Sequence, residues 1–314
     1  MKKLVSLLTL LCIFTTLLVS CGNEPEDNTI INIGVLSGPT GMGMAQLIST
    51  EGVDARYNFE VRSNPTDAVS ELANGDLDML CLPTNTAANL GASKSDYISV
   101  LAINCLGSLY LMTDENTTVT SIADLEGKTI YASVPTSTTG PIINYILSEN
   151  NVNATVEFEP DHDSLVAKVK KGEAPIVILP EPKATAAMKQ NAGYTIDLNF
   201  STEWDKISDE PLTMGCIVVR NEFLNAHKTV VERFLDEYKT SIEYIGNEAN
   251  LDTAAQMIVD AGILPQLPVA KSALGNLYGS IVYIDGQDMK DALLGFYDAI
   301  GQAKLPEDEF YYGA

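Results

Sequence analysis

The stretch SIADLEGKTIYASV, residues 121–134, decides how the chain is organised. Gly127 suits a tight turn, because glycine readily adopts the positive φ angles that many turns require. The residues after it, 128–134, form a predicted strand, and residues 138–147 form a predicted helix. Because a series of strands and helices already precedes this turn, the stretch marks the start of a second series.

Strands and helices alternate through both series, which is typical of parallel strands covered by helices. The predicted strands cover residues 30–37, 57–63, 77–82, 128–134, 154–159, 174–179, 194–200 and 212–220, and a long apolar stretch covers residues 98–112. The predicted helices cover residues 40–50, 65–73, 85–90, 138–147, 164–171, 183–190, 228–245, 251–261, 268–277 and 288–300.

Two such series predict an α/β fold with two lobes, each a mainly parallel sheet flanked by helices. The chain is expected to cross between the lobes at about 114–123 and to return at about 204–213. The first lobe then comprises residues 30–113 and 212–314, and the second lobe comprises residues 114–211. Ligands of such sheets bind beyond the carboxyl ends of the strands, which places the expected site in the cleft between the lobes.

The N-terminus has the pattern of an export signal, expected to cover residues 1–20. A basic start, Met1-Lys2-Lys3, precedes an apolar run over residues 4–19 that is short for a membrane span. The following Leu18-Val19-Ser20-Cys21-Gly22 resembles the lipobox of bacterial lipoproteins, which implies a lipid on Cys21. Residues 21–29 then form a polar, acidic tether. An ordinary signal peptide with a nearby cysteine is the alternative; the lipobox interpretation places the protein on the outer face of the cytoplasmic membrane.

Composition excludes several functions. The 314 residues include 42 acidic and 19 basic side chains, for a formal net charge of −23. Such a polyanion repels phosphate backbones, so no nucleic-acid partner is expected. With 46% hydrophobic and 19% charged residues, the chain has the composition of a globular protein.

Few residues are available for catalysis or for metal binding. The only histidines are His162 and His227, so a three-histidine zinc site is excluded. Asp161-His162-Asp163 fits the capped start of a helix better than a metal site. We therefore predict no metal, no cofactor and no catalytic residues. Three cysteines lie in apolar runs and are expected to be buried free thiols, with a disulfide as the open alternative: Cys81, Cys105 and Cys216.

Residues 124–130, DLEGKTI, resemble the DLxGKxI turn that leads into the second lobe of periplasmic-type substrate-binding proteins. With the lipobox and the helical C-terminus, the mature chain resembles the solute-binding lipoproteins of ABC importers, in particular the nitrate, sulfonate, taurine and thiamine-precursor-like group. The resemblance implies a two-lobed periplasmic-binding-protein-like (type II) fold that closes on a small solute. It also implies a monomer that docks on an ABC permease and ATPase complex. A tethered sensor without a transport role is the alternative from another functional class.

Four loops that follow predicted strands carry the candidate ligand-binding residues. Each residue could instead serve only as a helix cap, since Ser, Thr and Asn are the usual N-caps. Four such loops at one edge favour a site. The candidates are Ser37, Gly38, Pro39, Thr40, Met42, Asn85, Thr86, Thr136, Thr138, Thr139, Gly140 and Glu181.

The solute class is open between two alternatives. No arginine lies in the four loops, although a forked Arg partner is preferred for sulfonate or carboxylate recognition. Glu181, at the end of the strand over 174–179, favours a neutral or amino-bearing heterocycle of the thiamine-precursor type. The alternative is a sulfonate, nitrate or other small organic anion held by helix N-termini at Thr40 and Thr138. Trp204 could stack on the solute, but core packing is the more common role of a tryptophan.

Overall fold

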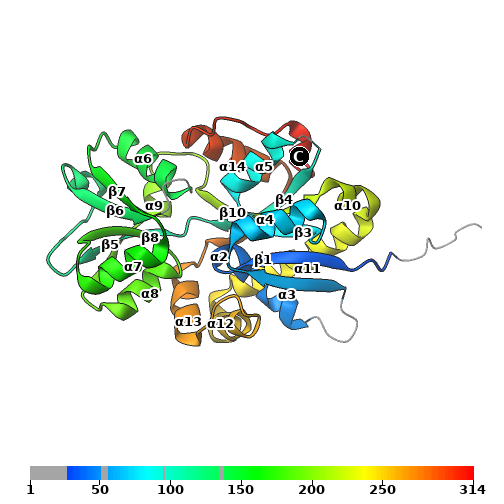
Figure 1. Cartoon of the computed structure of the whole chain (residues 1–314), viewed down its shortest axis with the longest axis horizontal. Coiled ribbons are helices and arrows are strands. Elements are labelled where there is room, and N and C mark those ends of the chain that lie inside the picture. Colours follow the sequence, from blue (N-terminus) through cyan, green and yellow to red (C-terminus); the bar gives the residue numbers. More distant parts are fainter. Residues whose placement is uncertain (1–26, 51–55, 95, 134–137) are drawn as a thin grey trace, which may run out of the picture.

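The computed structural model describes residues 27–50, 56–94, 96–133 and 138–314. The predicted signal, Cys21, most of the tether and Thr136 lie outside the described residues. Two separate sheets, each with its own helices, form the two lobes seen in Figure 1. The predicted two-lobed α/β fold is therefore confirmed.

The first sheet has the order β11-β4-β10-β3-β1-β2. Its strands are β1 Ile31–Leu36, β2 Tyr57–Arg62, β3 Met79–Pro83, β4 Ile98–Leu106, β10 Thr213–Arg220 and β11 Ile281–Ile284. Strand β1 runs parallel to β2 and β3, whereas β10 is antiparallel to both β3 and β4. The returning chain thus enters the sheet as an inserted antiparallel strand.

The second sheet repeats this arrangement in the order β7-β6-β8-β5-β9. Its strands are β5 Leu109–Asp114, β6 Thr129–Ser133, β7 Thr155–Glu159, β8 Ile176–Pro180 and β9 Tyr194–Asn199. Strand β6 is parallel to β7 and β8, and the crossing strand β5 is antiparallel to β8 and β9. Each sheet therefore combines parallel strands with an antiparallel strand from the crossing chain.

The helices surround the two sheets, and local chemistry explains several of their ends. Asn64 caps α4 by accepting from the Thr66 amide, and Pro65 occupies the first turn. The helices are α2 Pro39–Met42, α3 Ala45–Thr50, α4 Pro65–Asn74, α5 Thr84–Ser93, α6 Thr139–Glu149, α7 His162–Lys171, α8 Lys183–Gln190, α9 Phe200–Trp204, α10 Asn221–Ala226, α11 Lys228–Ile245, α12 Leu251–Asp260, α13 Leu267–Asn276 and α14 Gly286–Ala299.

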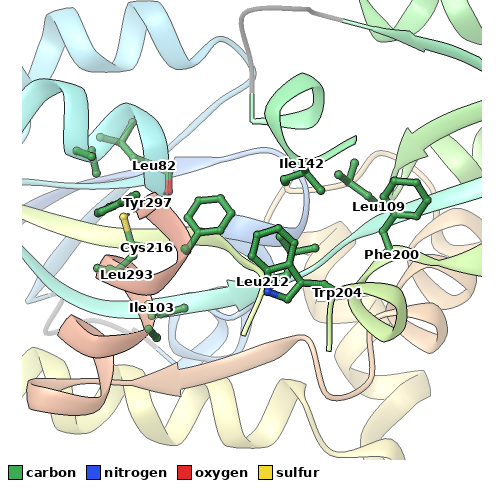
Figure 2. Packing of buried hydrophobic residues seen from close by; sticks show 14 of the residues in the cluster. Leu82, Ile103, Leu109, Ile142, Phe200, Trp204, Leu212, Cys216, Leu293 and Tyr297 are labelled. Carbon is green, nitrogen blue, oxygen red and sulfur yellow. Dashed lines mark hydrogen bonds between the residues drawn. The ribbon is translucent and has the colours of Figure 1, made fainter. Parts of the chain in front are cut away.

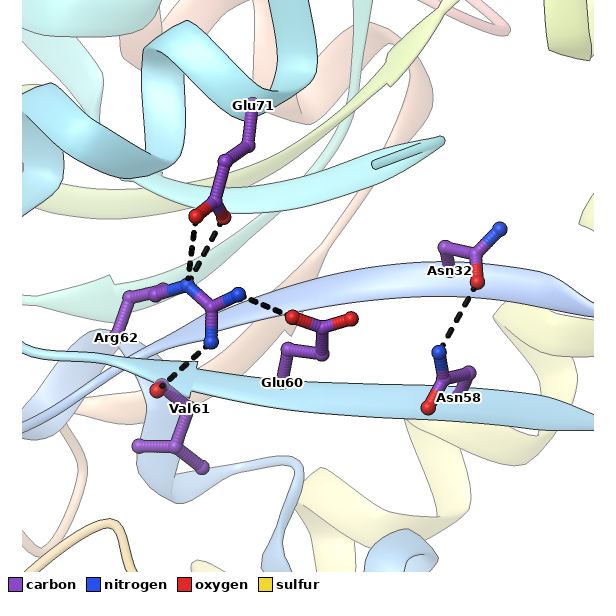
Figure 3. A network of polar contacts seen from close by, with 6 residues as sticks. All are labelled: Asn32, Asn58, Glu60, Val61, Arg62 and Glu71. Atoms are coloured by element: carbon purple, nitrogen blue, oxygen red, sulfur yellow. Dashed lines mark hydrogen bonds and ion pairs between the residues drawn. The ribbon is translucent and has the colours of Figure 1, made fainter. Parts of the chain in front are cut away.

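A polar network ties the edge strand β2 to its neighbours. Arg62 Nε donates to both carboxylate oxygens of Glu71 in α4, at 3.1 and 2.9 Å, and Arg62 Nη2 donates to Glu60 (Figure 3). Asn58 Nδ2 donates to Asn32 Oδ1 of β1 at 3.1 Å. The Ser37 amide also donates to the Arg62 carbonyl, at 2.8 Å. Together these contacts hold strand β2 next to the loop that follows β1.

The first crossing between the lobes lies earlier than the sequence predicted. Strand β4 ends at Leu106 in the first sheet and β5 begins at Leu109 in the second, so the chain crosses at Gly107 and Ser108 and not at 114–123. Residues 98–112 read as one long apolar stretch in the sequence because both strands are mostly apolar and buried. The return runs through residues 205–212, between α9 and β10.

One hydrophobic cluster runs through both lobes behind the crossing strands. Its centre is Trp204, which is fully buried and packs on Tyr145 of α6 and on Phe296 of α14, with ring centroids 4.9 and 5.7 Å away. The indole Nε1 donates to the Glu210 carbonyl at 2.7 Å. Figure 2 shows Trp204 between Ile142 and Phe200 of the second lobe and residues of the first. The core interpretation of Trp204 is confirmed.

Gly107 is the position at this crossing where a side chain does not fit. A Cβ atom there would lie 1.9 Å from Ser201 Oγ and 3.1 Å from Leu212 Cδ2. We expect Gly107→Ala to lower the free energy of unfolding by about 1–3 kcal/mol, the usual cost of overpacking a core. Urea unfolding followed by circular dichroism measures this change.

Gly275→Ala is the matched control, because Gly275 lies in α13 and a Cβ atom there would meet no atom within 4 Å. That variant should be as stable as the parent or slightly more stable, since alanine favours helix. Adding Ser201→Gly to Gly107→Ala should restore part of the loss. Equal effects of the two alanine substitutions would contradict the steric explanation.

Candidate functional site

The carboxyl ends of the parallel strands in the two sheets face each other across the junction. Gly38 follows β1 in the first lobe, and a Cβ atom on it would lie 3.9 Å from Pro182 Cδ of the second lobe. Asn85, at the start of α5, accepts a hydrogen bond of 3.0 Å from Thr138 Oγ1 at the start of α6. Loops predicted to hold the ligand thus meet at one place.

A second set of contacts centres on Asn276, the last residue of α13. Its side-chain Nδ2 donates to Glu181 Oε1 at 2.6 Å, and its carbonyl accepts from Tyr110 Oη at 2.5 Å. Asn276 belongs to the first lobe, whereas Tyr110 and Glu181 belong to the second. Helix α13 therefore lies against the second lobe, below the junction in Figure 1.

Glu181 is almost completely buried, with an exposed fraction of 2%. Besides Asn276, it accepts from Thr185 Oγ1 at 2.9 Å and from the Thr185 amide at 3.2 Å. Burial raises the pKa of this carboxyl group, and the hydrogen bonds from Asn276 and Thr185 oppose that shift. The carboxylate thus both caps α8 and joins the two lobes.

The other predicted site residues divide into two groups. Ser37 is exposed, and Pro39, Thr40 and Thr86 are partly exposed at the same edge. Thr139 and Gly140 are buried at the start of α6.

Met42 departs from the prediction, because its side chain is fully buried in the core of the first lobe. It was predicted from its place after β1. Its helix, α2, turns this apolar side chain away from the junction into the core. Thr136 and Cys21 lie outside the described residues.

Two groups of the second lobe were not predicted as site residues. Ser133, the last residue of β6, places Oγ 2.5 Å from Nδ1 of His162, the first residue of α7. Asp161 beside it accepts from the Ser164 amide at 2.7 Å, which confirms the predicted N-cap. Sequence reasoning also missed Asn276. Its contact with Glu181 joins residues 95 positions apart, and the Ser133–His162 contact joins residues 29 positions apart. No local sequence pattern relates residues at such separations.

A cavity of about 280 Å³ lies away from this edge, next to the start of β4 and the end of β10. It is lined by Gly91, Asp96, Ile98, Asn221, Glu307, Glu309 and Phe310. Because β1 and β3 end at the opposite side of the sheet, this cavity is separate from the candidate site.

The described residues contain no cluster of His, Cys, Asp and Glu that could hold a metal ion. Cys81, Cys105 and Cys216 are buried free thiols, as predicted. Burial raises the pKa of Cys81 and of Cys105 to about 12. In the described part of the chain, no helix combines the length and apolar character of a membrane span. The candidate site between the two lobes therefore consists mainly of neutral hydrogen-bonding groups, such as Asn85, Thr138 and Asn276, together with the carboxyl group of Glu181.

Comparisons with known proteins agree with this architecture. A protein-family model described as menaquinone biosynthesis matches residues 42–300. No curated protein sequence matches the chain.

Several solved structures share the fold. An ABC transporter protein from Parabacteroides distasonis aligns with a TM-score of 0.75 and 19% identity, over 90% of this chain and 98% of that one. The ligand-binding component of an ABC-type import system from Staphylococcus aureus has a TM-score of 0.70 and 14% identity, over 90% and 96%. The periplasmic aliphatic sulphonate binding protein SsuA from Escherichia coli has a TM-score of 0.69 and 13% identity, over 90% and 97%. At these identities the likeness establishes the fold.

The burial of Glu181 predicts a pH-dependent stability. Because its pKa is raised in the folded protein, the native state binds more protons than the unfolded state between the unfolded and the folded pKa. The stability that Glu181 contributes should be fully present below its unfolded pKa and should be lost as the pH rises through the folded pKa. Urea unfolding of the parent and of Glu181→Gln across this range should show the parent losing stability relative to the variant. Parallel curves would contradict this prediction.

Proposed function

The chain belongs to the menaquinone biosynthesis family. From the two-lobed architecture and its likeness to binding proteins of ABC importers, we propose that it is the extracytoplasmic substrate-binding component of an ABC importer. It would capture a small solute between the lobes and deliver it to a membrane permease. The observation that carries this proposal is the convergence of Gly38, Asn85, Thr138 and Glu181, from two lobes, at facing strand ends. Open α/β sheets bind their ligands at such edges.

Hydrogen bonds between the lobes explain how binding and closure would be coupled. Asn85–Thr138 and Asn276–Glu181 form only when the lobes are together. A solute that contacts both lobes adds to these bonds and shifts the population towards the closed state. The continuous core around Trp204 would serve as the pivot.

Closure predicts a change in overall size. Small-angle scattering should give a smaller radius of gyration with saturating solute than without it, because the lobes approach each other around the solute. Thermal shift against a solute panel finds the solute first, since a ligand of the folded state raises the melting temperature. An unchanged radius at saturation would contradict closure.

Asn276→Ala should weaken solute binding by about ten- to hundredfold, because it removes a hydrogen bond to a charged group that holds the lobes together. Ser272→Ala, on the exposed face of the same helix, is the matched control and should leave the affinity unchanged. Calorimetry with the solute found by thermal shift measures both. Equal affinities of the two variants would remove Asn276 from the closure mechanism.

We also propose that the protein is a lipoprotein attached to the membrane through Cys21, on the basis of the lipobox described above. Cys21→Ser should move the protein from the membrane fraction to the soluble fraction. Fractionation and immunoblotting measure the distribution. Retention of the variant in the membrane at the parent's level would contradict the anchor.

A second candidate function is an enzyme acting on a small molecule held in the same cleft, and the description of the family favours it. An enzyme would convert its ligand, whereas a binding protein would return it unchanged. Mass spectrometry of the solute after incubation with stoichiometric protein distinguishes the two. A permease and an ATPase encoded beside the gene would favour import.

A further inference from the structure

Ser133 and His162 lie at the edge of the second lobe that faces the first. Strands β6 and β8 are parallel, so Ser133 at the end of β6 and Glu181 just after β8 lie at the same edge. Glu181 contacts Asn276 of the first lobe, which identifies this edge as the facing one. His162 begins α7, which packs against α8, the helix that follows Glu181.

The hydrogen bond between the two side chains fixes the position of the imidazole proton. Ser133 is completely buried, and within the described chain its hydroxyl has His162 Nδ1 as its partner, at 2.5 Å. If Nδ1 carried the proton, the Ser133 hydroxyl hydrogen would be buried without an acceptor among the described residues, which is unfavourable. The hydroxyl therefore donates to Nδ1, and the ring proton lies on Nε2.

The imidazole is also kept neutral. Burial lowers the pKa of His162, and the positive charge of Lys183 lowers it further, whereas Asp163 and Asp161 act in the opposite direction. Asp161 is engaged as the cap of α7, and Asp163 forms an ion pair of 2.5 Å with Lys183. Among the described residues, no hydrogen bond reaches His162 Nε2.

We infer that the Nε2–H group of His162, oriented by Ser133, is a neutral hydrogen-bond donor that recognises an uncharged carbonyl oxygen of the solute. This inference rests on the proposed binding function and specifies its solute class, an amide or a carbonyl-bearing heterocycle. A neutral donor suits a neutral acceptor, because neither group has to be stripped of the strong hydration of an ion.

The charges around the pair disfavour an anionic solute. Asp161, Asp163, Glu181 and Glu159, the register partner of Ser133, lie at this edge. The cations placed among them, Lys183 and Lys168, are paired with Asp163 and Glu159. The net charge of −23 adds long-range repulsion of anions. The carboxylate of Glu181 already accepts three hydrogen bonds from the protein, so it is less available to an amino group of the solute. We therefore assign the main polar contact to a carbonyl group of the solute that accepts from His162.

The proton position is tested without any ligand by long-range ¹H–¹⁵N correlation spectra of the histidine rings. The chain has two histidines, so His227→Gln assigns the signals. His162 should be the neutral Nε2–H form at pH 7, and Ser133→Ala should convert it to a mixture of tautomers, whereas Ser133→Thr should keep the parent form. An Nδ1–H form or a charged ring in the parent protein would overturn the inference.

Solute class is tested with three probes of the same shape: nicotinamide, nicotinate and 3-picolylamine, which carry a neutral amide, an anion and a cation. Nicotinamide should bind most tightly and should shift the His162 Nε2 signal most. His162→Phe should weaken nicotinamide binding by about tenfold or more, and His227→Gln, at the distant pair with Asp27, should not. Tighter binding of nicotinate, or no effect of any probe on His162, would overturn the inference.

Failure of this assignment can be distinguished from failure of the binding function. If solute found by thermal shift closes the lobes in scattering, and His162→Phe binds it with unchanged affinity, the binding function stands and the role of His162 is wrong. If no solute closes the lobes, the proposed function itself is contradicted, whatever the tautomer of His162.

Discussion

The packing of Trp204 between Tyr145 and Phe296 is the contact on which the arrangement of the two lobes depends. It joins helices of both lobes in a single hydrophobic cluster, so the lobes share one core at their junction. Apolar contacts of this kind have no fixed direction and tolerate small rotations better than a hydrogen-bonded interface does. Polar groups of the two lobes meet beside this core, at the Asn85–Thr138 and Asn276–Glu181 hydrogen bonds.

The two crossing strands connect the shared core with these polar groups. Strands β10 and β5 each insert between other strands of a sheet, and both have almost entirely buried residues. The neighbouring parallel strands, β1, β3, β6 and β8, carry the polar loops at their carboxyl ends. Because β5 and β10 are antiparallel to β8 and β3, they begin at the edge where those strands end, so the crossing chain and the polar loops lie at the same junction.

The sequence predicted most of the elements, since the alternation of apolar residues and capping residues such as Asp161 are local signals. The first crossing was misplaced because the strands on both sides of Gly107 and Ser108 are mostly apolar and buried, so these two residues alone did not mark a boundary between lobes. The sequence named Glu181 and Asn85 from their places after strands, but it could not give their partners, Asn276 and Thr138, which come from the other lobe. Met42 was assigned to the cleft from its loop alone, although its apolar side chain was a signal for the core.

The three buried thiols have a practical consequence for measuring motion between the lobes. A thiol reacts with maleimides as the thiolate, and burial keeps Cys81 and Cys105 protonated, with pKa values of about 12, and raises the pKa of Cys216 as well. In a chain that begins after Cys21, these native thiols should therefore stay unlabelled in the folded protein. A pair of new cysteines on exposed helices of the two lobes could then take a donor and an acceptor dye, without removal of any native cysteine, and report the distance between the lobes molecule by molecule.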